Sequence, residues 1–150
     1  AQAGDPEAAA AQYAAAIAEH PGNPGLLVNA SNVFKSLGRI DQAREQLKQA
    51  LAIAPDLAGG WYNLGILYQE TWWLVEALEA FLRAHAIEKP RGDTELCRTL
   101  TMSIGLALQQ SGQWRRSRQF LEEAAAAFPQ AAADYIRLAL FTWEIGRAHV

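Results

Sequence analysis

The sequence predicts an all-α protein built from stacked pairs of helices, and three observations support that prediction. Helix-forming residues dominate the 150 residues, alanine above all, whereas Val, Ile and Thr are few. Apolar residues recur at helical spacing within a repeat of 34 residues. Several glycines and prolines fall where the helical segments should end.

The first expected element is a single helix within residues 5–21. Asp5 can cap its N-terminus, and Pro6 fits the first turn, where no backbone N–H is needed. Ala9, Tyr13 and Ala16 then continue along one side of the helix. This segment corresponds to the second helix of a repeat without the first, so we expect a half repeat.

Two whole repeats are expected next, at residues 24–57 and 58–90. Four residues of the second repeat share one helical face through their i, i+3, i+4, i+7 spacing: Trp61, Leu64, Gly65 and Tyr68. A matching stripe of the following helix comprises Ala77, Phe81 and Ala84. A small residue recurs at one position of the first stripe and should let a neighbouring helix approach closely; these residues are Ser31, Gly65, Gly105 and Ala139.

The second half of the chain has a lengthened junction at residues 91–97, a third repeat at 98–131 and a final half repeat at 132–147. The third copy begins its pattern about six residues late. Gly38, Gly112 and Gly146 stand where first helices should stop, since glycine readily adopts a left-handed C-cap. We therefore expect residues 1–150 to form a single array, and to be a segment of a longer one. Alternatively, the last residues form an irregular terminus.

Composition narrows the classes of function. The formal net charge is −3 and the basic residues are dispersed, which argues against nucleic-acid binding. No apolar run is long enough to cross a membrane. The single cysteine, Cys97, cannot form an internal disulfide. We expect a cytoplasmic location and a bacterial source, or a periplasmic location if an export signal has been removed before this sequence begins.

No catalytic constellation is recognisable in the sequence. His20, His85 and His149 lie far apart in the repeat, and there is no glycine-rich phosphate loop. The acidic residues on the helices are interpreted as solvated faces; they are Glu76, Glu79, Glu88, Glu122 and Glu123. We therefore expect no enzyme, no metal site and no cofactor.

The repeat has a recognisable motif. Leu27-Val-Asn-Ala-Ser31 aligns with Trp61-Tyr-Asn-Leu-Gly65, and Ala43, Leu47 and Ala50 align with Ala77, Phe81 and Ala84. On these residues the sequence resembles the tetratricopeptide repeat family over essentially its whole length. The resemblance implies a right-handed α-solenoid of antiparallel helix pairs, with about eight helices. It also implies that the first helices line a concave groove that holds an extended or helical segment of a partner.

The resemblance places the groove at defined positions of each first helix. The residues expected to bind a partner are Asn29, Asn32, Lys35, Tyr62, Asn63, Ile66, Gln69, Met102, Leu106, Gln109, Ile136, Leu140 and Trp143. The asparagines could bond the backbone of an extended peptide or could simply be motif residues. The apolar C-terminal half could receive a partner, or a further helix could cover it. Val28, Thr99 and Ser103 replace the basic residues of the family's carboxylate clamp, which excludes a chaperone-tail receptor.

Trp72 and Trp73 depart from the family pattern. The other repeats have Gly38-Arg39 and Gly112-Gln113 at this turn between helices. One tryptophan could pack under the junction near Pro90. Alternatively, the pair forms an exposed patch for self-association or for a partner, since tryptophan is frequent at the centre of interfaces.

The leading hypothesis is a non-catalytic scaffold that binds a protein or peptide in its groove. A second hypothesis is the substrate-recruiting arm of a larger protein-modifying enzyme, and a third is a module for homo-oligomerisation. No feature of the sequence identifies the partner.

Overall fold

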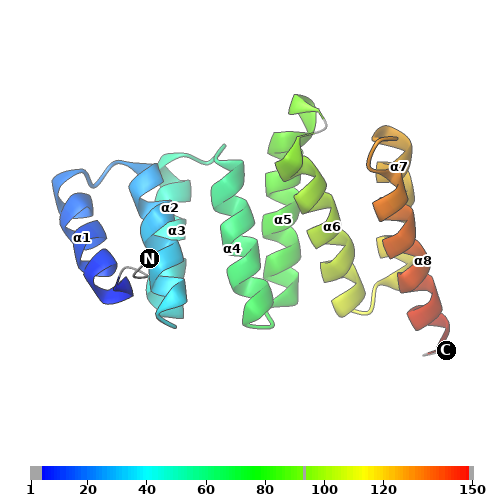
Figure 1. Ribbon diagram of the computed structural model, residues 1–150, viewed down its shortest axis with the longest axis horizontal. Coiled ribbons are helices and arrows are strands. Elements are labelled where there is room, and N and C mark those ends of the chain that lie inside the picture. Colours follow the sequence, from blue (N-terminus) through cyan, green and yellow to red (C-terminus); the bar gives the residue numbers. More distant parts are fainter. Residues whose placement is uncertain (1–4, 93, 149–150) are drawn as a thin grey trace.

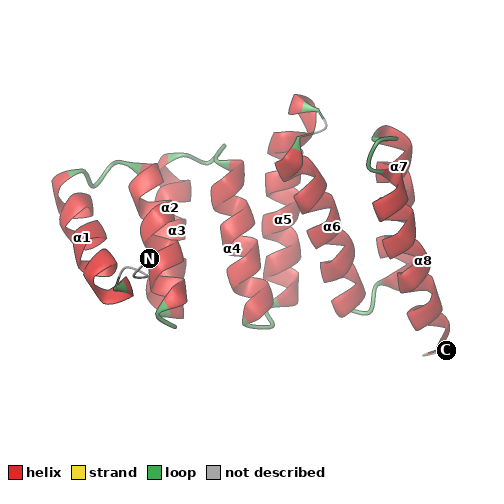
Figure 2. Cartoon of the chain, in the orientation of Figure 1, coloured by secondary structure: helices red, strands yellow, loops and turns green. Residues whose placement is uncertain are grey.

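The structure is a computed structural model of the chain, and it describes residues 5–92 and 94–148. Within these residues it contains only helices and connecting turns (Figure 1, Figure 2). The elements are α1 (Pro6–Glu19), α2 (Pro24–Ser36), α3 (Ile40–Ile53), α4 (Ala58–Glu70), α5 (Leu74–Glu88), the 3₁₀ turn η1 (Lys89–Arg91), α6 (Glu95–Gln110), α7 (Trp114–Ala127) and α8 (Ala132–Ala148). The predicted all-α solenoid of about eight helices is confirmed.

Each helix packs against the next one along the chain, and the termini lie at opposite ends of the stack (Figure 1). The first helices of successive pairs also contact one another directly, α2 with α4, α4 with α6 and α6 with α8. The second helices α3, α5 and α7 approach one another less closely. A stack curves toward the side on which neighbours are closer, so the first helices line its inner side.

The two helices of a pair meet at the predicted small residue. A Cβ atom on Gly65 would lie 2.5 Å from the ring of Phe81 on α5, and one on Gly105 would lie 2.9 Å from the side chain of Leu121 on α7. Phe81 and Leu121 have no exposed surface. The glycines therefore allow the large side chain of the second helix to lie directly on the first helix.

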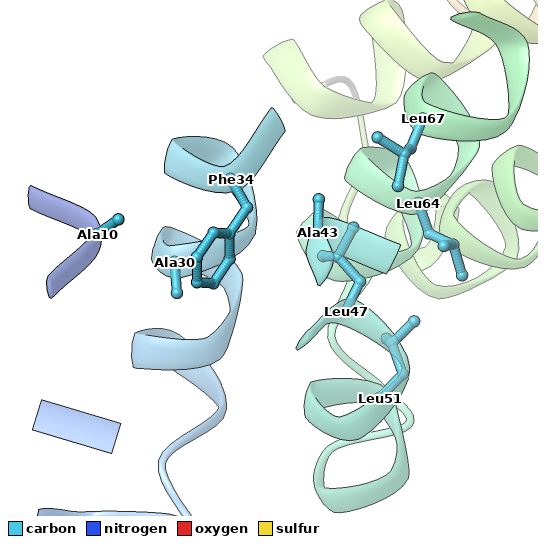
Figure 3. Packing of buried hydrophobic residues seen from close by; sticks show 8 residues of the cluster. All are labelled: Ala10, Ala30, Phe34, Ala43, Leu47, Leu51, Leu64 and Leu67. Atoms are coloured by element: carbon cyan, nitrogen blue, oxygen red, sulfur yellow. The ribbon is translucent and has the colours of Figure 1, made fainter. Parts of the chain in front are cut away.

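Three groups of buried side chains follow one another along the stack. Figure 3 shows the first group, in which Ala10 of α1 points toward Phe34 of α2, and Leu47 of α3 lies opposite Leu64 of α4. Trp61 and Tyr68 pack against the first two groups and so join them. The core is therefore a row of small clusters, as expected when each repeat buries its apolar stripe only against its neighbours.

The ends of the helices follow the sequence signals with one exception. Asp5 caps α1 by accepting a hydrogen bond from the backbone N–H of Glu7 (3.0 Å). Gly38 and Gly112 adopt the expected left-handed conformation, with φ of 71° and 74°. The prediction for Gly146 is wrong, because α8 continues through it to Ala148. A Cβ atom at Gly146 would lie 3.1 Å from Trp114, so this glycine allows α8 to pack against α7.

The junction expected at residues 91–97 is shorter than that range, because α6 already begins at Glu95. Glu88, interpreted from the sequence as solvated, is only 4% exposed. Its carboxylate accepts hydrogen bonds from Thr94 Oγ1 (2.7 Å) and from the Arg91 guanidinium (3.0 Å). Thr94 Oγ1 also accepts from the backbone N–H of Cys97 and so caps α6. The inserted residues are thus organised around one buried carboxylate.

The crossing of α4 and α5 predicts opposite effects for two Gly→Ala substitutions in the same helix. Gly65→Ala should lower the free energy of unfolding by about 1–2 kcal/mol, because the new methyl overlaps the Phe81 ring. Gly59→Ala meets no atom within 4 Å and should raise it by about 0.5 kcal/mol through a less flexible unfolded chain. Urea denaturation of both variants measures the difference. Equal effects would show that no close approach exists at Gly65.

Candidate functional site

The N-terminal half of the first-helix row is polar, and its polar residues bond one another between repeats. Asn63 Nδ2 on α4 donates to Asn32 Oδ1 on α2 (3.4 Å). Lys35 Nζ forms an ion pair with Glu70 (2.7 Å), again between α2 and α4. These bonds tie consecutive first helices together at the surface. Asn29 is exposed on the same face.

The polar ladder continues from α4 to α6. Gln69 Nε2 donates to Gln110 Oε1 (2.7 Å). Gln109 was expected beside them in the groove, but its side chain is only 8% exposed and its Oε1 has no hydrogen-bond partner in the described part of the chain. Gln109 therefore lies inside the fold and not in the groove where the sequence placed it.

The apolar residues of α4 are partly covered by the helix pair itself. Tyr62 lies against Phe81 with ring centroids 6.0 Å apart, and Ile66 packs against the same core cluster. Leu106 on α6 is more open, with 41% of its surface exposed. The first-helix row thus becomes more open to an apolar ligand toward the C-terminal end of the array.

The most open part of this row is a cleft of about 400 Å³ between α6 and α8. A gap between α2 and α4, which α3 also lines, is only about 20 Å³. The cleft is mainly apolar and has charged residues among its lining residues, which are Arg98, Met102, Ala131, Asp134, Tyr135, Arg137, Leu138 and Phe141. A single large apolar side chain of a ligand would fit this volume.

Only Met102 of this cleft was anticipated from the sequence. Phe141 takes the repeat position of Leu67, which is buried at 1% exposure between two repeats. Phe141 is 54% exposed, since the α6–α8 gap is not closed. The resemblance to the family did not predict Phe141 as a groove residue, because Leu67, at the same position of an earlier repeat, belongs to the core.

Ile136 and Leu140 do not line this cleft, although the sequence placed them in the same stripe as Met102. They line a second hollow, of about 470 Å³, whose other wall is α7. Ile136 is 47% and Leu140 57% exposed. The side chain of Trp143 lies outside the described residues. The expected apolar stripe is therefore divided into an inner cleft and a surface at the C-terminal end.

Comparisons with known proteins agree with this architecture. Residues 1–70 match the sequence model of the family described as "Tetratricopeptide repeat". The nearly identical TPR-like repeats of a Podosopora anserina protein of kinesin-light-chain type superpose with a TM-score of 0.80 at 19% identity, covering 95% of this chain and 80% of that one. The first 70 residues thus match the tetratricopeptide family, and the described chain has the fold of tetratricopeptide-like solenoids.

Two crystal structures of MamA show the same fold. They superpose with TM-scores of 0.72 and 0.71, each at 19% identity, and cover 98% and 94% of this chain and 93% and 84% of theirs. At this identity the likeness concerns the fold alone. A search among curated proteins finds no match to the chain.

The turn between α4 and α5 differs from the turns between α2 and α3 and between α6 and α7. Trp72 is the one residue other than glycine with a positive φ in the described chain, 62°, and it takes the place of Gly38 and Gly112. Its side chain is 75% exposed. A left-handed conformation costs a residue with a Cβ atom about 1 kcal/mol or more. The fold gains no compensating burial from Trp72.

Trp73 contributes less to an exposed patch than the sequence suggested. Its ring stacks on Tyr68 (centroids 5.8 Å apart, 8° between planes), and the Arg44 guanidinium lies 4.9 Å above it. It does not pack under the junction near Pro90, which lies at the other end of α5 (Figure 1). Trp73 is still 48% exposed, against 75% for Trp72, so Trp72 is the more exposed residue of the association patch predicted from the sequence.

The described residues contain no group of three His, Cys, Asp or Glu side chains that could hold a metal ion. His85 packs edge-on against Phe120 (5.5 Å), and burial, together with the nearby Lys89, lowers its pKa. Cys97 is buried in α6. None of the helices in the described part of the array is long and apolar enough to span a membrane.

The strain at Trp72 predicts a stabilising substitution. Trp72→Gly should raise the free energy of unfolding by about 1 kcal/mol, because glycine adopts a positive φ without strain and little buried surface is lost. Gly112→Ala, at the equivalent turn, should lower it by about as much. Thermal and urea denaturation compare the two. Destabilisation by Trp72→Gly would mean that the tryptophan supports the fold.

Proposed function

We propose that this tetratricopeptide array is a non-catalytic scaffold that binds a segment of another protein along its first-helix face. The observation that carries the proposal is the apolar cleft between α6 and α8, which opens on the inner side of the stack. Apolar side chains left exposed beside a cleft favour a ligand that covers them.

The N-terminal half of the face would guide the same segment by hydrogen bonds. Its polar groups are already paired between repeats, as in the Lys35–Glu70 ion pair, and so form a pre-arranged surface. A pre-arranged surface loses little side-chain entropy on binding. We therefore assign orientation of the ligand to this half and most of the affinity to the apolar half.

The cleft also indicates what the ligand should carry. Arg98 and Arg137 line it together with a single acidic residue, Asp134. Asp134 lies 3.9 Å from Arg137, both with largely exposed side chains, so this pair is weak. The preferred segment should present one large apolar side chain with an acidic residue close to it.

A peptide-display selection against the immobilised protein tests the proposal. Selected peptides should share an apolar anchor next to Asp or Glu. They should bind Phe141→Lys, which places a charge in the cleft, and Leu106→Lys, which places one on the exposed apolar part of α6, at least roughly tenfold more weakly than the wild type. Fluorescence polarisation measures the affinities.

Leu82→Lys is the matched control. Leu82 on α5 is 39% exposed, nearly the same as Leu106, but it belongs to a second helix. The control should bind the selected peptides as the wild type does. Equal binding by all the variants, or loss of binding only in Leu82→Lys, would contradict a ligand site on the first-helix face.

A further inference from the structure

An outer cleft lies between the second helices α3 and α5, on the side of the stack opposite the first-helix row. It has a volume of about 460 Å³. Leu51, Leu64 and Ala80 are its buried lining residues, and Trp61 and Tyr68 of α4 also line it. All its lining residues belong to α3, α4, α5 and the turn before α4, so the outer cleft lies within the array, between two whole helix pairs.

The chain contains an equivalent of the outer cleft one repeat later, between α5 and α7. Its volume is only about 200 Å³. The correspondence follows from the repeat, since Leu82 lies 34 residues after Lys48, and Ile104, Leu108 and Phe120 lie 40 residues after Leu64, Tyr68 and Ala80. The two gaps therefore share their position in the repeat and differ in the side chains that line them.

Phe120 fills the equivalent gap. Its ring packs edge-on against His85 of α5, with 5.5 Å between ring centroids, and contacts the second core cluster. His85 is the repeat equivalent of Leu51, so the Phe120 ring bridges the two second helices. In α5 the same position is Ala80, whose side chain ends at Cβ. The outer cleft is therefore open where a ring lies in its equivalent.

We infer that the outer cleft binds an aromatic side chain of a partner protein, and that a basic residue of the same segment pairs with Glu76 and Glu79. The ring would take the place that corresponds to the Phe120 ring one repeat later. The molecule itself thus indicates the size and the kind of side chain that this gap accepts.

The aromatic walls of the outer cleft support an aromatic ligand. Trp61 and Tyr68 have no aromatic equivalents one repeat later. Trp61 is held by a hydrogen bond from Nε1 to the carbonyl of Pro55 (2.9 Å) and by the Arg83 guanidinium 4.7 Å above its ring, and Tyr68 stacks on Trp73. Rings attract one another through their edges and faces, and walls already in place lose little entropy on binding.

Charge complementarity accounts for the basic residue of the ligand. Glu76 and Glu79 lie three residues apart on α5, so their exposed carboxylates share one side of the outer cleft. Within the described residues neither carboxylate forms an ion pair. At the filled gap these positions are Arg116 and Gln119. Lys48 of α3 also lines the outer cleft, so an acidic ligand residue would meet one opposite charge and two like charges.

Nuclear magnetic resonance on the isotope-labelled chain tests the site with three short peptides. Acetyl-Ala-Phe-Lys-Ala-amide should shift the indole N–H signal of Trp61 and the amide signals of α3 and α5 around the outer cleft. Acetyl-Ala-Phe-Glu-Ala-amide should bind there about two- to fivefold more weakly, the range expected for exposed ion pairs. Acetyl-Ala-Ala-Lys-Ala-amide, which has no ring, should leave these signals unchanged.

A substitution that fills the outer cleft tests the equivalence of the two gaps. Ala80→Phe should place a ring where Phe120 lies one repeat later, so it should fold with a urea midpoint no lower than that of the wild type and abolish binding of the Phe-Lys peptide. Ala86→Phe is the matched control, since it adds the same side chain at an exposed position of the same helix outside the outer cleft. It should bind the peptide as the wild type does.

The charge contribution has its own variant. Glu76→Gln combined with Glu79→Gln should remove the preference for the Phe-Lys over the Phe-Glu peptide without changing the fold. The Phe-Glu peptide is the one that the cleft between α6 and α8 should prefer, so the location of the shifted signals separates the two sites. Phe141→Lys should leave binding at the outer cleft unchanged, whatever its effect on the first-helix face.

Four results would overturn the inference. They are unchanged Trp61 and α5 signals at millimolar Phe-Lys peptide, a preference for the Phe-Glu peptide at the outer cleft, an Ala80→Phe variant that still binds, and an Ala80→Phe variant that is less stable than the wild type. Shifts of the same signals on dilution without peptide would assign the outer cleft to a second copy of the chain and would also contradict it.

Discussion

The fold depends on the close approach of the two helices of each pair. Gly65 and Gly105 leave room for Phe81 and Leu121 to lie directly on the backbone of the first helix. Without that space the second helix would have to move outward, and the apolar stripes on both helices would lose contact. Because the same crossing recurs, the stack extends by repetition, and each helix is stabilised by its immediate neighbours.

This manner of growth determines where functional surface is available. The second helices cover one side of each first helix, so the inner row of first helices stays accessible in the described part of the stack. Hydrogen bonds between α2 and α4 close the inner row of first helices in its N-terminal half. The row is open between α6 and α8, where Phe141 occupies the repeat position of the buried Leu67.

The repeat pattern predicted the helices and their crossings well, because periodicity, small residues and capping signals are local. Gly38 and Gly112 show this, since their conformations follow from their positions. The prediction of a helix end at Gly146 failed because glycine occurs both in turns and at close contacts between helices. The contact of Gly146 with Trp114 shows that it serves the second role, and this contact is visible only in the folded structure. Glu88 likewise looked solvated until the folded junction brought Thr94 and Arg91 to its carboxylate. The α6–α8 cleft depends on the distance between two helices, which the sequence pattern does not contain.

Native-state hydrogen exchange on the monomeric protein at low concentration tests most directly whether each helix is stabilised by its neighbours alone. Amides of α4 and α5, which have a packed helix on both sides, should exchange most slowly. Amides of α1 and α8, each packed on one side in the described structure, should exchange fastest. Equal protection along the whole chain would contradict the account, since it would show one cooperative unit rather than a stack held by pairwise crossings.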